Sequence, residues 1–421
     1  MRFDNLQAWL GWQETLHPSD IELGLERIQQ VWHYLHPSEF KPVVITVSGT
    51  NGKGSSCAML ESIYLAAGYK VGCYTSPHFL RYTERIKLLG KEANENALCH
   101  AFEVIDQARG NQSLTYFEFG TLAALFLFAQ ADLDVVILEV GLGGRLDAVN
   151  IIDADVALLT SVGLDHMDWL GTDRESIGKE KAGIFRQSRP AICAESAPPD
   201  SVLQYASEIG AQCLVQDRDF KATRVDTSWS WCGPDKRSRY SLPVPALRGD
   251  IQIRNASAVL MVLQVLEDRL PVNQNHLRQG LLGATIPGRF QVVAGDVPII
   301  LDVAHNPDAA KVLLANLTER HCQGRTYAIC GMLADKDSQS VINVMADVIS
   351  RWYLVPVQAS RGAPAEQLSE HLVTLGITDS RLMANVPQAI EQARLQSRPG
   401  DQIIVFGSFY VVADALEWLQ T

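Results

Sequence analysis

The chain has 421 residues, is 47% hydrophobic and carries a formal net charge of -12 at pH 7. Its length predicts two or three globular domains, and its negative charge argues against nucleic acid or an anionic membrane as a partner. Anionic small ligands are not excluded, because a local cationic pocket can oppose the overall field.

Cysteine usage and the N-terminal segment indicate a cytoplasmic protein. The eight cysteines show no C-x-x-C spacing, which favours reduced, structural thiols. The N-terminal segment lacks the basic start and long apolar core of a signal peptide. The apolar run from Leu122 to Ala129 is far shorter than the ~20 residues of a membrane span.

A strand, a glycine-rich turn and a helix follow one another from Val43 onward. Val43 to Val47 are apolar apart from Thr46 and all β-branched, which predicts a buried parallel strand. The turn GTNGKG comes next, and a helix with one apolar face begins after it. Glycine N–H groups, the helix dipole and the Lys53 ammonium together favour an anion such as phosphate. The general nucleotide-loop pattern is imperfect, since Val47 replaces its first glycine and Gly54 separates Lys53 from Ser55. A glycine turn that binds nothing is the alternative.

Three further strands end in polar side chains. Residues 70–75 lead to Ser76, residues 134–139 end in Glu139, and residues 155–161 lead to His166. Open α/β sheets bind ligands at the carboxyl ends of their strands, and an acid opposite a phosphate loop commonly holds a metal ion. The alternatives are a turn serine at Ser76, a helix cap at Glu139 and a structural histidine at His166.

Helical patterns cover residues 5–35, 94–109, 118–131 and 174–185. Within the first of these, Ile21 to Ile28 predicts an amphipathic helix. Thr115 to Glu118 precede the third, and their aromatic side chains suit either a core or the face of a flat ligand. The fourth carries Lys179 and Lys181, which we expect to be solvated.

A domain boundary divides the second half of the chain. Residues 189–247 contain a strand, a helix and short β-like runs, of which TSWSW and SRYSLPVP predict an antiparallel hairpin. In the helix expected at 253–266, Asn255 is either a polar residue at the helix start or a ligand contact. Ile286 to Arg289, with its proline and glycine, marks the boundary. Strands at 299–303, 326–330, 352–357 and 402–406 then alternate with helices, which predicts a second, smaller α/β domain.

DVAHNP, residues 302–307, lies where a strand of this second domain leads into a helix. Asn306 as N-cap and Pro307 in the first turn have structural explanations. Asp302 and His305 have none, which makes them candidates for ligand binding.

The glycine loop, read as GTNGKGS, resembles the ATP loop of the Mur-ligase superfamily and of its folate branch, the folylpolyglutamate synthases and dihydrofolate synthases. The resemblance continues in order through TSPH, YTERI, LTYFEFGT, LEVGLGGRLDAVN, LDHMDWLG, GKEKAGIF, PGRFQ and DVAHNP, which cover most of the chain. It implies an α/β fold with a P-loop-containing, Mur-ligase-like ATPase domain at residues 1–287, which binds ATP and folate. A smaller Rossmann-like domain at residues 288–421, the glutamate-ligase domain, follows.

The resemblance also implies roles for individual residues. The catalytic residues are Lys53, His166, Asp302 and His305. The ATP contacts are Gly49, Thr50, Asn51, Gly52, Lys53, Gly54, Ser55, Asn255, Arg289 and Asp302. The folate contacts are Ile21, Glu22, Leu23, Thr115, Tyr116, Phe117, Glu118 and Leu146, and the glutamate contacts are His305 and Ser408. The metal ligands are Ser76, Glu139 and His166, joined by Lys181 if that lysine reacts with carbon dioxide to form a carbamate.

The implied activity is ATP-dependent ligation of L-glutamate through an acyl phosphate. Dihydropteroate would give dihydrofolate, and reduced folyl-glutamates would give folylpolyglutamates. Two magnesium ions are the implied cofactors, the partners are these small molecules, and we expect a monomer.

Three alternatives remain open. One is a monofunctional folylpolyglutamate synthase. Another is a murein peptide ligase, which would carry a further domain of roughly a hundred residues before the ATP loop, whereas here the loop starts at Gly49. The third is a nucleotide switch or ATPase without synthetic activity, but the chain has no Asn-Lys-x-Asp signature.

Overall fold

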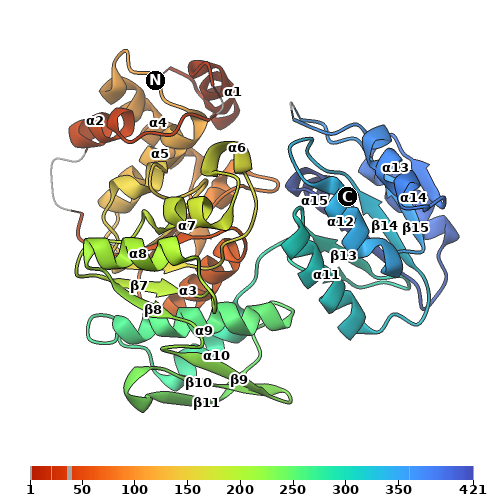
Figure 1. Ribbon diagram of the computed structural model, residues 1–421. Helices are drawn as coiled ribbons and strands as arrows, with labels where there is room; N and C mark the ends of the chain where they lie inside the picture. Colours follow the sequence, from red (N-terminus) through yellow and green to blue (C-terminus); the bar gives the residue numbers. More distant parts are fainter. Residues whose placement is uncertain (1, 20, 36–39, 360, 421) are drawn as a thin grey trace. The chain divides into compact units, whose positions relative to one another are not determined.

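The computed structural model describes residues 2–19, 21–35, 40–359 and 361–420, and these form two compact units (Figure 1). The first unit comprises Met1–Ala246 and Gln252–Thr285, and the second comprises Leu247–Ile251 and Ile286–Thr421. Each unit has its own largely parallel sheet with helices packed on it, so the expected α/β class is confirmed. Among the described residues, no helix combines the length and apolar character that crossing a bilayer demands.

The first unit is built on an eight-stranded sheet in the order β4-β3-β2-β5-β1-β6-β7-β8. Its parallel strands are β1 (Val43–Ser48), β2 (Val71–Tyr74), β5 (Val135–Glu139), β6 (Val156–Leu159), β7 (Pro190–Cys193) and β8 (Gln212–Val215); β3 (Ile86–Leu88) and β4 (Lys91–Glu92) run antiparallel. β1 lies between β5 and β6, and all six of its residues are buried. A continuous apolar run is what a strand covered on both faces requires.

Helices account for most of the remaining first unit. They are α1 (Leu6–Leu16), α2 (Glu26–Leu35), α3 (Lys53–Ala66), α4 (Glu95–Arg109), α5 (Tyr116–Gln130), α6 (Met167–Leu170), α7 (Arg174–Ala182), α8 (Asp200–Ile209), α9 (Asp250–Val265) and α10 (Gln274–Gly283). Short 3-10 turns occur at Tyr82–Arg85, Ala148–Ile151 and Pro234–Lys236. α3 and α10 pack closely because Gly280 has no side chain: a Cβ there would lie 2.4 Å from the Ile63 Cα.

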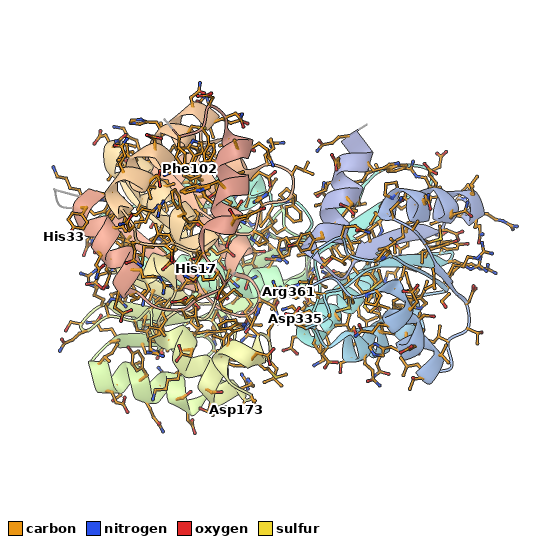
Figure 2. The ribbon with its side chains drawn as sticks, turned by 90° about the horizontal axis from the view of Figure 1, so that it is seen from above. His17, His33, Phe102, Asp173, Asp335 and Arg361 are labelled. Atoms are coloured by element: carbon orange, nitrogen blue, oxygen red, sulfur yellow. The ribbon has the colours of Figure 1, made fainter. Side chains whose placement is uncertain are left out.

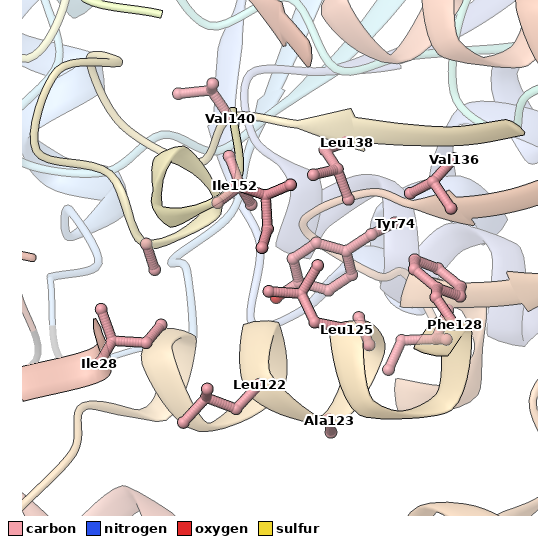
Figure 3. Close-up of a cluster of buried hydrophobic side chains, with 14 of the residues drawn as sticks. Ile28, Tyr74, Leu122, Ala123, Leu125, Phe128, Val136, Leu138, Val140 and Ile152 are labelled. Atoms are coloured by element: carbon pink, nitrogen blue, oxygen red, sulfur yellow. The ribbon is translucent and has the colours of Figure 1, made fainter. Parts of the chain in front are cut away.

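The core of the first unit lies between the sheet and α5. Figure 3 shows Tyr74 of β2 with Leu138 of β5 and Leu125 of α5 around it. Phe128 is fully buried there, and its truncation to alanine is expected to cost about 3–5 kcal/mol. Further along, Phe102 (Figure 2) packs edge-on against Phe119 at 5.5 Å between ring centroids. This packing fixes the N-terminus of α5, which belongs to the candidate site.

A three-stranded antiparallel sheet completes the first unit. β9 (Lys221–Val225), β10 (Ser228–Cys232) and β11 (Ser238–Pro243) pair in the order β11-β10-β9. The hairpin expected from TSWSW and SRYSLPVP is therefore confirmed, with Trp229 and Trp231 as its buried side chains.

The second unit has a six-stranded sheet in the order β12-β13-β17-β14-β15-β16. β12 (Gln291–Val293) is antiparallel to β13 (Ile299–Asp302), whereas β14 (Thr326–Cys330), β15 (Arg351–Leu354), β16 (Ser380–Leu382) and β17 (Gln402–Phe406) are parallel. Its helices are α11 (Pro307–Arg320), α12 (Ser338–Met345), α13 (Ala365–Thr374), α14 (Val386–Gln396) and α15 (Phe409–Gln420), with a 3-10 turn at Ala346–Val348. An ion pair of 3.4 Å between Arg361 and Asp335, both labelled in Figure 2, ties two of its loops together.

Three local expectations were wrong. The segment from Ile21 to Gly24 is not helical, and α2 begins only at Glu26. Tyr116 to Glu118 do not precede α5 but form its first turn, because Thr115 and Glu118 make a capping box. Asn255 lies in the second turn of α9, which starts at Asp250, so it is not a helix-start residue.

Candidate functional site

The phosphate-loop candidate requires glycine at two positions. Gly49 follows β1 with a φ of 149°, and a Cβ there would lie 1.9 Å from the Thr160 Oγ1. Gly52 is the N-cap of α3 with a φ of 87°, in the left-handed region that side chains rarely adopt. A Cβ on Gly52 would lie 2.9 Å from the Asn255 Oδ1. The loop is thus closely packed against the residues that follow β6 and against α9.

Hydrogen bonds attach the loop to residues 160–163, which we call the β6 segment. The Asn51 N–H donates to the Ser161 Oγ at 2.9 Å, and the Thr160 hydroxyl donates to the Asn51 carbonyl at 2.7 Å. The Thr50 N–H donates to the Ser161 carbonyl at 2.9 Å, and the Gly163 N–H donates to the Thr50 hydroxyl at 3.0 Å. The loop is therefore held in place by the protein itself, which is the preorganisation that phosphate transfer needs.

The ammonium group of Lys53 lies against the backbone of this loop. Its Nζ donates to the Gly49 carbonyl at 2.9 Å and to the Thr50 carbonyl at 3.3 Å. Gly54 and Ser55 are buried in the first turn of α3, directly behind it. The N-terminus of a helix and a lysine at the same place make a cationic cradle suited to a phosphate chain.

Ser76 and Glu139 are brought together at the carboxyl ends of β2 and β5. Glu139 is 5% exposed, and its Oε2 accepts the Ser76 N–H at 3.2 Å. A hydroxyl and a carboxylate are hard oxygen donors of the kind Mg²⁺ prefers, and Mg²⁺ commonly takes only one or two ligands from the protein. These two residues fit such an ion.

His166 is the N-cap of α6 and has a left-handed backbone with a φ of 51°. Its N–H donates to the Asp165 Oδ1 at 2.9 Å. Within residues 2–19, 21–35, 40–359 and 361–420, no group of three or more His, Cys, Asp or Glu side chains is arranged to hold a metal ion. The assignment of His166 as a metal ligand stays a prediction.

Lys181 differs sharply from Lys179 on the same helix. Lys179 is exposed, as expected, whereas Lys181 is only 5% exposed, so the expectation of a solvated side chain is wrong for it. Burial, and to a lesser extent the Lys53 ammonium, lower the pKa of Lys181 to about 7, while Asp165 and Asp147 oppose the change. Lys181 thus lies within electrostatic reach of the loop lysine, and near neutral pH much of it is an uncharged amine.

Asp147 is a site residue that sequence reasoning did not single out. Its carboxylate accepts the N–H groups of Gly141, Leu142 and Val149 at 3.1, 2.9 and 3.0 Å and so shapes the glycine-rich segment after β5. Burial raises its pKa to about 6, and the three backbone N–H groups limit the rise. An acid three residues after the last glycine of this segment was the available signal.

The predicted folate residues at the start of α5 fall into two groups. Glu118 is 3% exposed; its Oε2 accepts the Thr115 N–H at 2.8 Å and its Oε1 accepts the Arg27 Nη2 at 3.2 Å. Tyr116 and Phe117 are only partly buried. The Phe117 ring also touches the glycine segment, since a Cβ on Gly141 would lie 2.7 Å from it. The aromatic rings, rather than Glu118, are therefore accessible to a ligand.

Arg27 connects the predicted folate residues near the N-terminus with those on α5. It bonds to Glu22 as well as to Glu118, and Glu22 also pairs with the His17 Nε2 at 3.1 Å. Ile21, Leu23 and Leu146 are partly buried. Arg27 itself was missed at the sequence level, because its partner Glu118 is 91 residues away in the chain.

Asn255 lies in the first unit, whereas the remaining candidates, from Arg289 onward, lie in the second. Asn255 is 4% exposed, packs against Gly52 as described, and its Nδ2 donates to the Gln252 Oε1 at 3.1 Å. The structure therefore brings it to the phosphate loop.

In the second unit, the candidates gather at the carboxyl ends of the adjacent strands β13 and β17. The Asp302 carboxylate accepts the Phe290 and Ala304 N–H groups, both at 2.8 Å, and burial raises its pKa while Arg289 lowers it. The His305 Nδ1 lies 2.8 Å from the Val303 carbonyl, which makes Nδ1 the donor and directs Nε2 elsewhere.

Phe409 joins this group, and sequence reasoning missed it. Its ring lies beneath the Arg289 guanidinium at 5.4 Å and 6.4 Å from the His305 ring. Ser408 beside it is 3% exposed, and its Oγ accepts the Val411 N–H at 3.2 Å. The Ser408 hydroxyl is therefore engaged at the start of α15.

Comparison with known families places these features in context. Residues 47–263 match the Mur ligase middle domain, and residues 288–409 match the Mur ligase glutamate ligase domain. The chain therefore belongs to the Mur ligase superfamily, as the resemblance of its glycine loop implied. The dihydrofolate synthase/folylpolyglutamate synthase of Escherichia coli strain K12 is 47% identical over 413 residues, which are 98% of this chain and 95% of that one. The chain belongs to the dihydrofolate synthase/folylpolyglutamate synthase family.

Solved structures agree with this. E. coli FolC in complex with DHPP and ADP is 45% identical, with a TM-score of 0.94 over 99% of this chain and 98% of that chain. A bifunctional folylpolyglutamate synthase/dihydrofolate synthase with Mn, AMPPNP and L-glutamate bound is 47% identical, with a TM-score of 0.92 over 99% and 98%.

Proposed function

We propose that this chain is an ATP-dependent ligase that adds L-glutamate to dihydropteroate, forming dihydrofolate, and to reduced folyl-glutamates, forming folylpolyglutamates. The observation that carries the proposal is the phosphate loop with Lys53 at its mouth and Ser76 with Glu139 at the neighbouring strand ends, in a chain of this family. ATP with a divalent metal ion is the expected co-substrate, consistent with the ligands of the related structures.

The chemistry explains why a phosphate loop is needed. A carboxylate does not accept an amine directly, because its oxygen is a poor leaving group. Transfer of the γ-phosphoryl group of ATP to the folate carboxylate forms an acyl phosphate and releases ADP; the glutamate amine then attacks the acyl carbon and phosphate leaves. Lys53 and the loop N–H groups stabilise the negative charge of the phosphoryl group in flight.

Magnesium held by Ser76, Glu139 and His166 would neutralise further phosphate charge. Lys181 supplies a second anionic ligand in this proposal. Its uncharged amine attacks carbon dioxide, a C–N bond forms, a proton is released, and the product is a carbamate whose single negative charge is shared by two oxygens. The burial of Lys181 and its pKa of about 7 support this step, since only the uncharged amine is a nucleophile.

The folate would lie against the partly buried rings of Tyr116 and Phe117, with Ile21, Leu23 and Leu146 as further apolar contacts. A flat pterin ring suits stacking on an aromatic face. Glu118 and Thr115 act by capping α5, and Glu22 acts with Arg27, rather than as free hydrogen-bonding groups.

In this proposal residues 1–287 bind ATP and folate, and residues 288–421 form the glutamate-ligase domain. Asn255, Arg289 and Asp302 are proposed to contact ATP. His305 is proposed to contact glutamate. Ser408 is proposed to orient the same region through α15, because its hydroxyl already caps that helix. We propose a cytoplasmic protein, which the eight free cysteines support, and we propose that it is a monomer.

The test is the coupling of radiolabelled L-glutamate by the purified full chain. Dihydropteroate and tetrahydrofolate are offered separately, with and without ATP, and ADP is measured alongside. Labelled product from both acceptors, each dependent on ATP, supports the proposal. Product from tetrahydrofolate alone identifies a monofunctional folylpolyglutamate synthase. ADP release that depends on neither acceptor contradicts ligase function.

A further inference from the structure

A cluster of charged side chains lies beside the β6 segment and has no role in the reaction described above. We call it the Glu195 cluster; it consists of Glu195, Arg174 and Arg254. Glu195 follows β7, its side chain is 15% exposed, and its Oε1 accepts the Arg254 Nη2 at 2.9 Å. The Arg174 Nη2 lies 3.5 Å from its Oε2. Three elements, β7, α7 and α9, therefore meet at one carboxylate.

The cluster holds the backbone of a single residue, Val162, on both sides. The Glu195 Oε2 accepts the Val162 N–H at 2.9 Å, and the Arg174 Nε donates to the Val162 carbonyl at 3.0 Å. Arg254 is itself anchored, since its Nε donates to the Ala194 carbonyl at 2.7 Å. Charge-assisted hydrogen bonds of this kind are shorter and stronger than neutral ones and fix a backbone position well.

Val162 occupies the middle of the β6 segment, whose neighbouring residues bond to the phosphate loop. Ser161 on one side bonds to Thr50 and Asn51, and Gly163 on the other bonds to Thr50. The same segment continues directly to Asp165 and His166. A displacement of Val162 would therefore shift both the loop and the predicted metal ligand.

A second connection runs through α9. Arg254 precedes Asn255, whose side chain packs against Gly52 in the turn before Lys53. Glu195 thus reaches the phosphate loop from two sides: through Val162 to Thr50 and Asn51, and through Arg254 and Asn255 to Gly52. An ion pair that served stability alone would not need to contact both the β6 segment and the helix α9, which each hold the phosphate loop.

We propose that Glu195, with Arg174 and Arg254, is a positioning residue for nucleotide binding: it sets the spacing between the phosphate loop, the β6 segment and α9. Its ligand class is a nucleoside triphosphate bound with a divalent metal ion. The inference rests on the proposed function, because it assumes that ATP binds at this loop.

The test is Glu195→Gln in the full chain, because glutamine keeps an acceptor for the Val162 N–H but loses the charge that both arginines need. The dissociation constant of AMPPNP with Mg²⁺ is measured by titration calorimetry at a temperature where circular dichroism reports a fully folded variant. We expect it to rise roughly tenfold, the lower range for residues that orient ligand-binding groups. The KM for glutamate should stay unchanged, a split that general destabilisation would not produce.

Glu175→Gln is the matched control. Glu175 also joins segments by accepting backbone N–H groups, those of Asp200 at 3.2 Å and Ser201 at 2.8 Å, but it has no bond to the β6 segment. The AMPPNP dissociation constant of this variant should stay within about twofold of the wild type, as for other exposed charged residues.

Arg254→Gln and the double variant complete a thermodynamic cycle. If the two residues act together, Glu195→Gln has a smaller effect in the Arg254→Gln background than in the wild type. Equal AMPPNP affinity of wild type and Glu195→Gln overturns the inference, and so does an equal loss in Glu175→Gln. Failure of the wild type itself to bind AMPPNP would instead overturn the proposed function, so the two failures are distinguishable.

Discussion

Replacement of Lys181 by methionine should stabilise the protein while removing the amine proposed to carry a carbamate. The folded protein holds Lys181 buried, with a pKa lowered from 10.5 to about 7. At about 1.4 kcal/mol for each pKa unit, the buried ammonium costs about 5 kcal/mol of folding free energy at pH 6. Methionine has similar length, fits buried sites well and carries no charge.

The pH dependence has a definite sign. Between pH 7 and 10.5 the unfolded chain binds a proton on Lys181 that the folded chain lacks, so the stability of the wild type rises with pH across this window. Below pH 7 both states are protonated and the full cost remains. The advantage of Lys181→Met should therefore shrink from about 5 kcal/mol at pH 6 to about 2 kcal/mol at pH 9.

Denaturant unfolding in buffer free of carbon dioxide and of metal ions measures this difference. Lys179→Met is the control, because Lys179 is exposed on the same helix and its replacement should change stability by less than about 0.5 kcal/mol. If Lys181→Met and the wild type show parallel stability profiles from pH 6 to 9, the electrostatic reasoning about Lys181 is refuted.

Three other variants probe separate parts of the account. Gly49→Ala should lower the synthesis rate by roughly 100-fold with an unchanged circular dichroism spectrum, because the new Cβ meets the Thr160 hydroxyl; normal turnover would contradict the enclosed loop. Thr115→Ala should lower the free energy of unfolding by about 1 kcal/mol through loss of the α5 cap, and an unchanged denaturation midpoint would argue against that cap. Phe409→Leu should lower kcat by roughly tenfold through loss of its contact with Arg289, whereas Phe409→Tyr keeps the aromatic face and should stay near normal; similar rates for both variants would rule out this role.

Features with a local cause were predictable from the sequence. Apart from Thr46, residues 43–47 are apolar, as a strand buried on both faces requires, and Gly52 supplies the left-handed backbone at the N-cap of α3. The helix N-cap Asn306 and the strand β17 follow equally from neighbouring residues. In such cases the physical reason lies within a few residues of the feature.

Features that depend on distant parts of the chain could not be predicted from the sequence. Lys179 and Lys181 look alike in sequence, and only the packing of α7 against the rest of the first unit buries one of them. The hydrogen-bond partners that give Glu195 and Arg27 their structural roles, Val162 and Glu118, lie 33 and 91 residues away in the chain. The short strands β3, β4 and β16 depend on pairing with a neighbour rather than on their own residues, which explains why they were missed.

The central claim is that Lys53 and its loop activate a folate carboxylate with ATP. Its most direct test is the rate of dihydrofolate formation from dihydropteroate, L-glutamate and ATP by the wild type and by Lys53→Ala. The account predicts dihydrofolate from the wild type and a rate lower by ~100-fold or more in the variant, which corresponds to roughly 3 kcal/mol of lost transition-state stabilisation. Equal rates, or no dihydrofolate from the wild type, would contradict it.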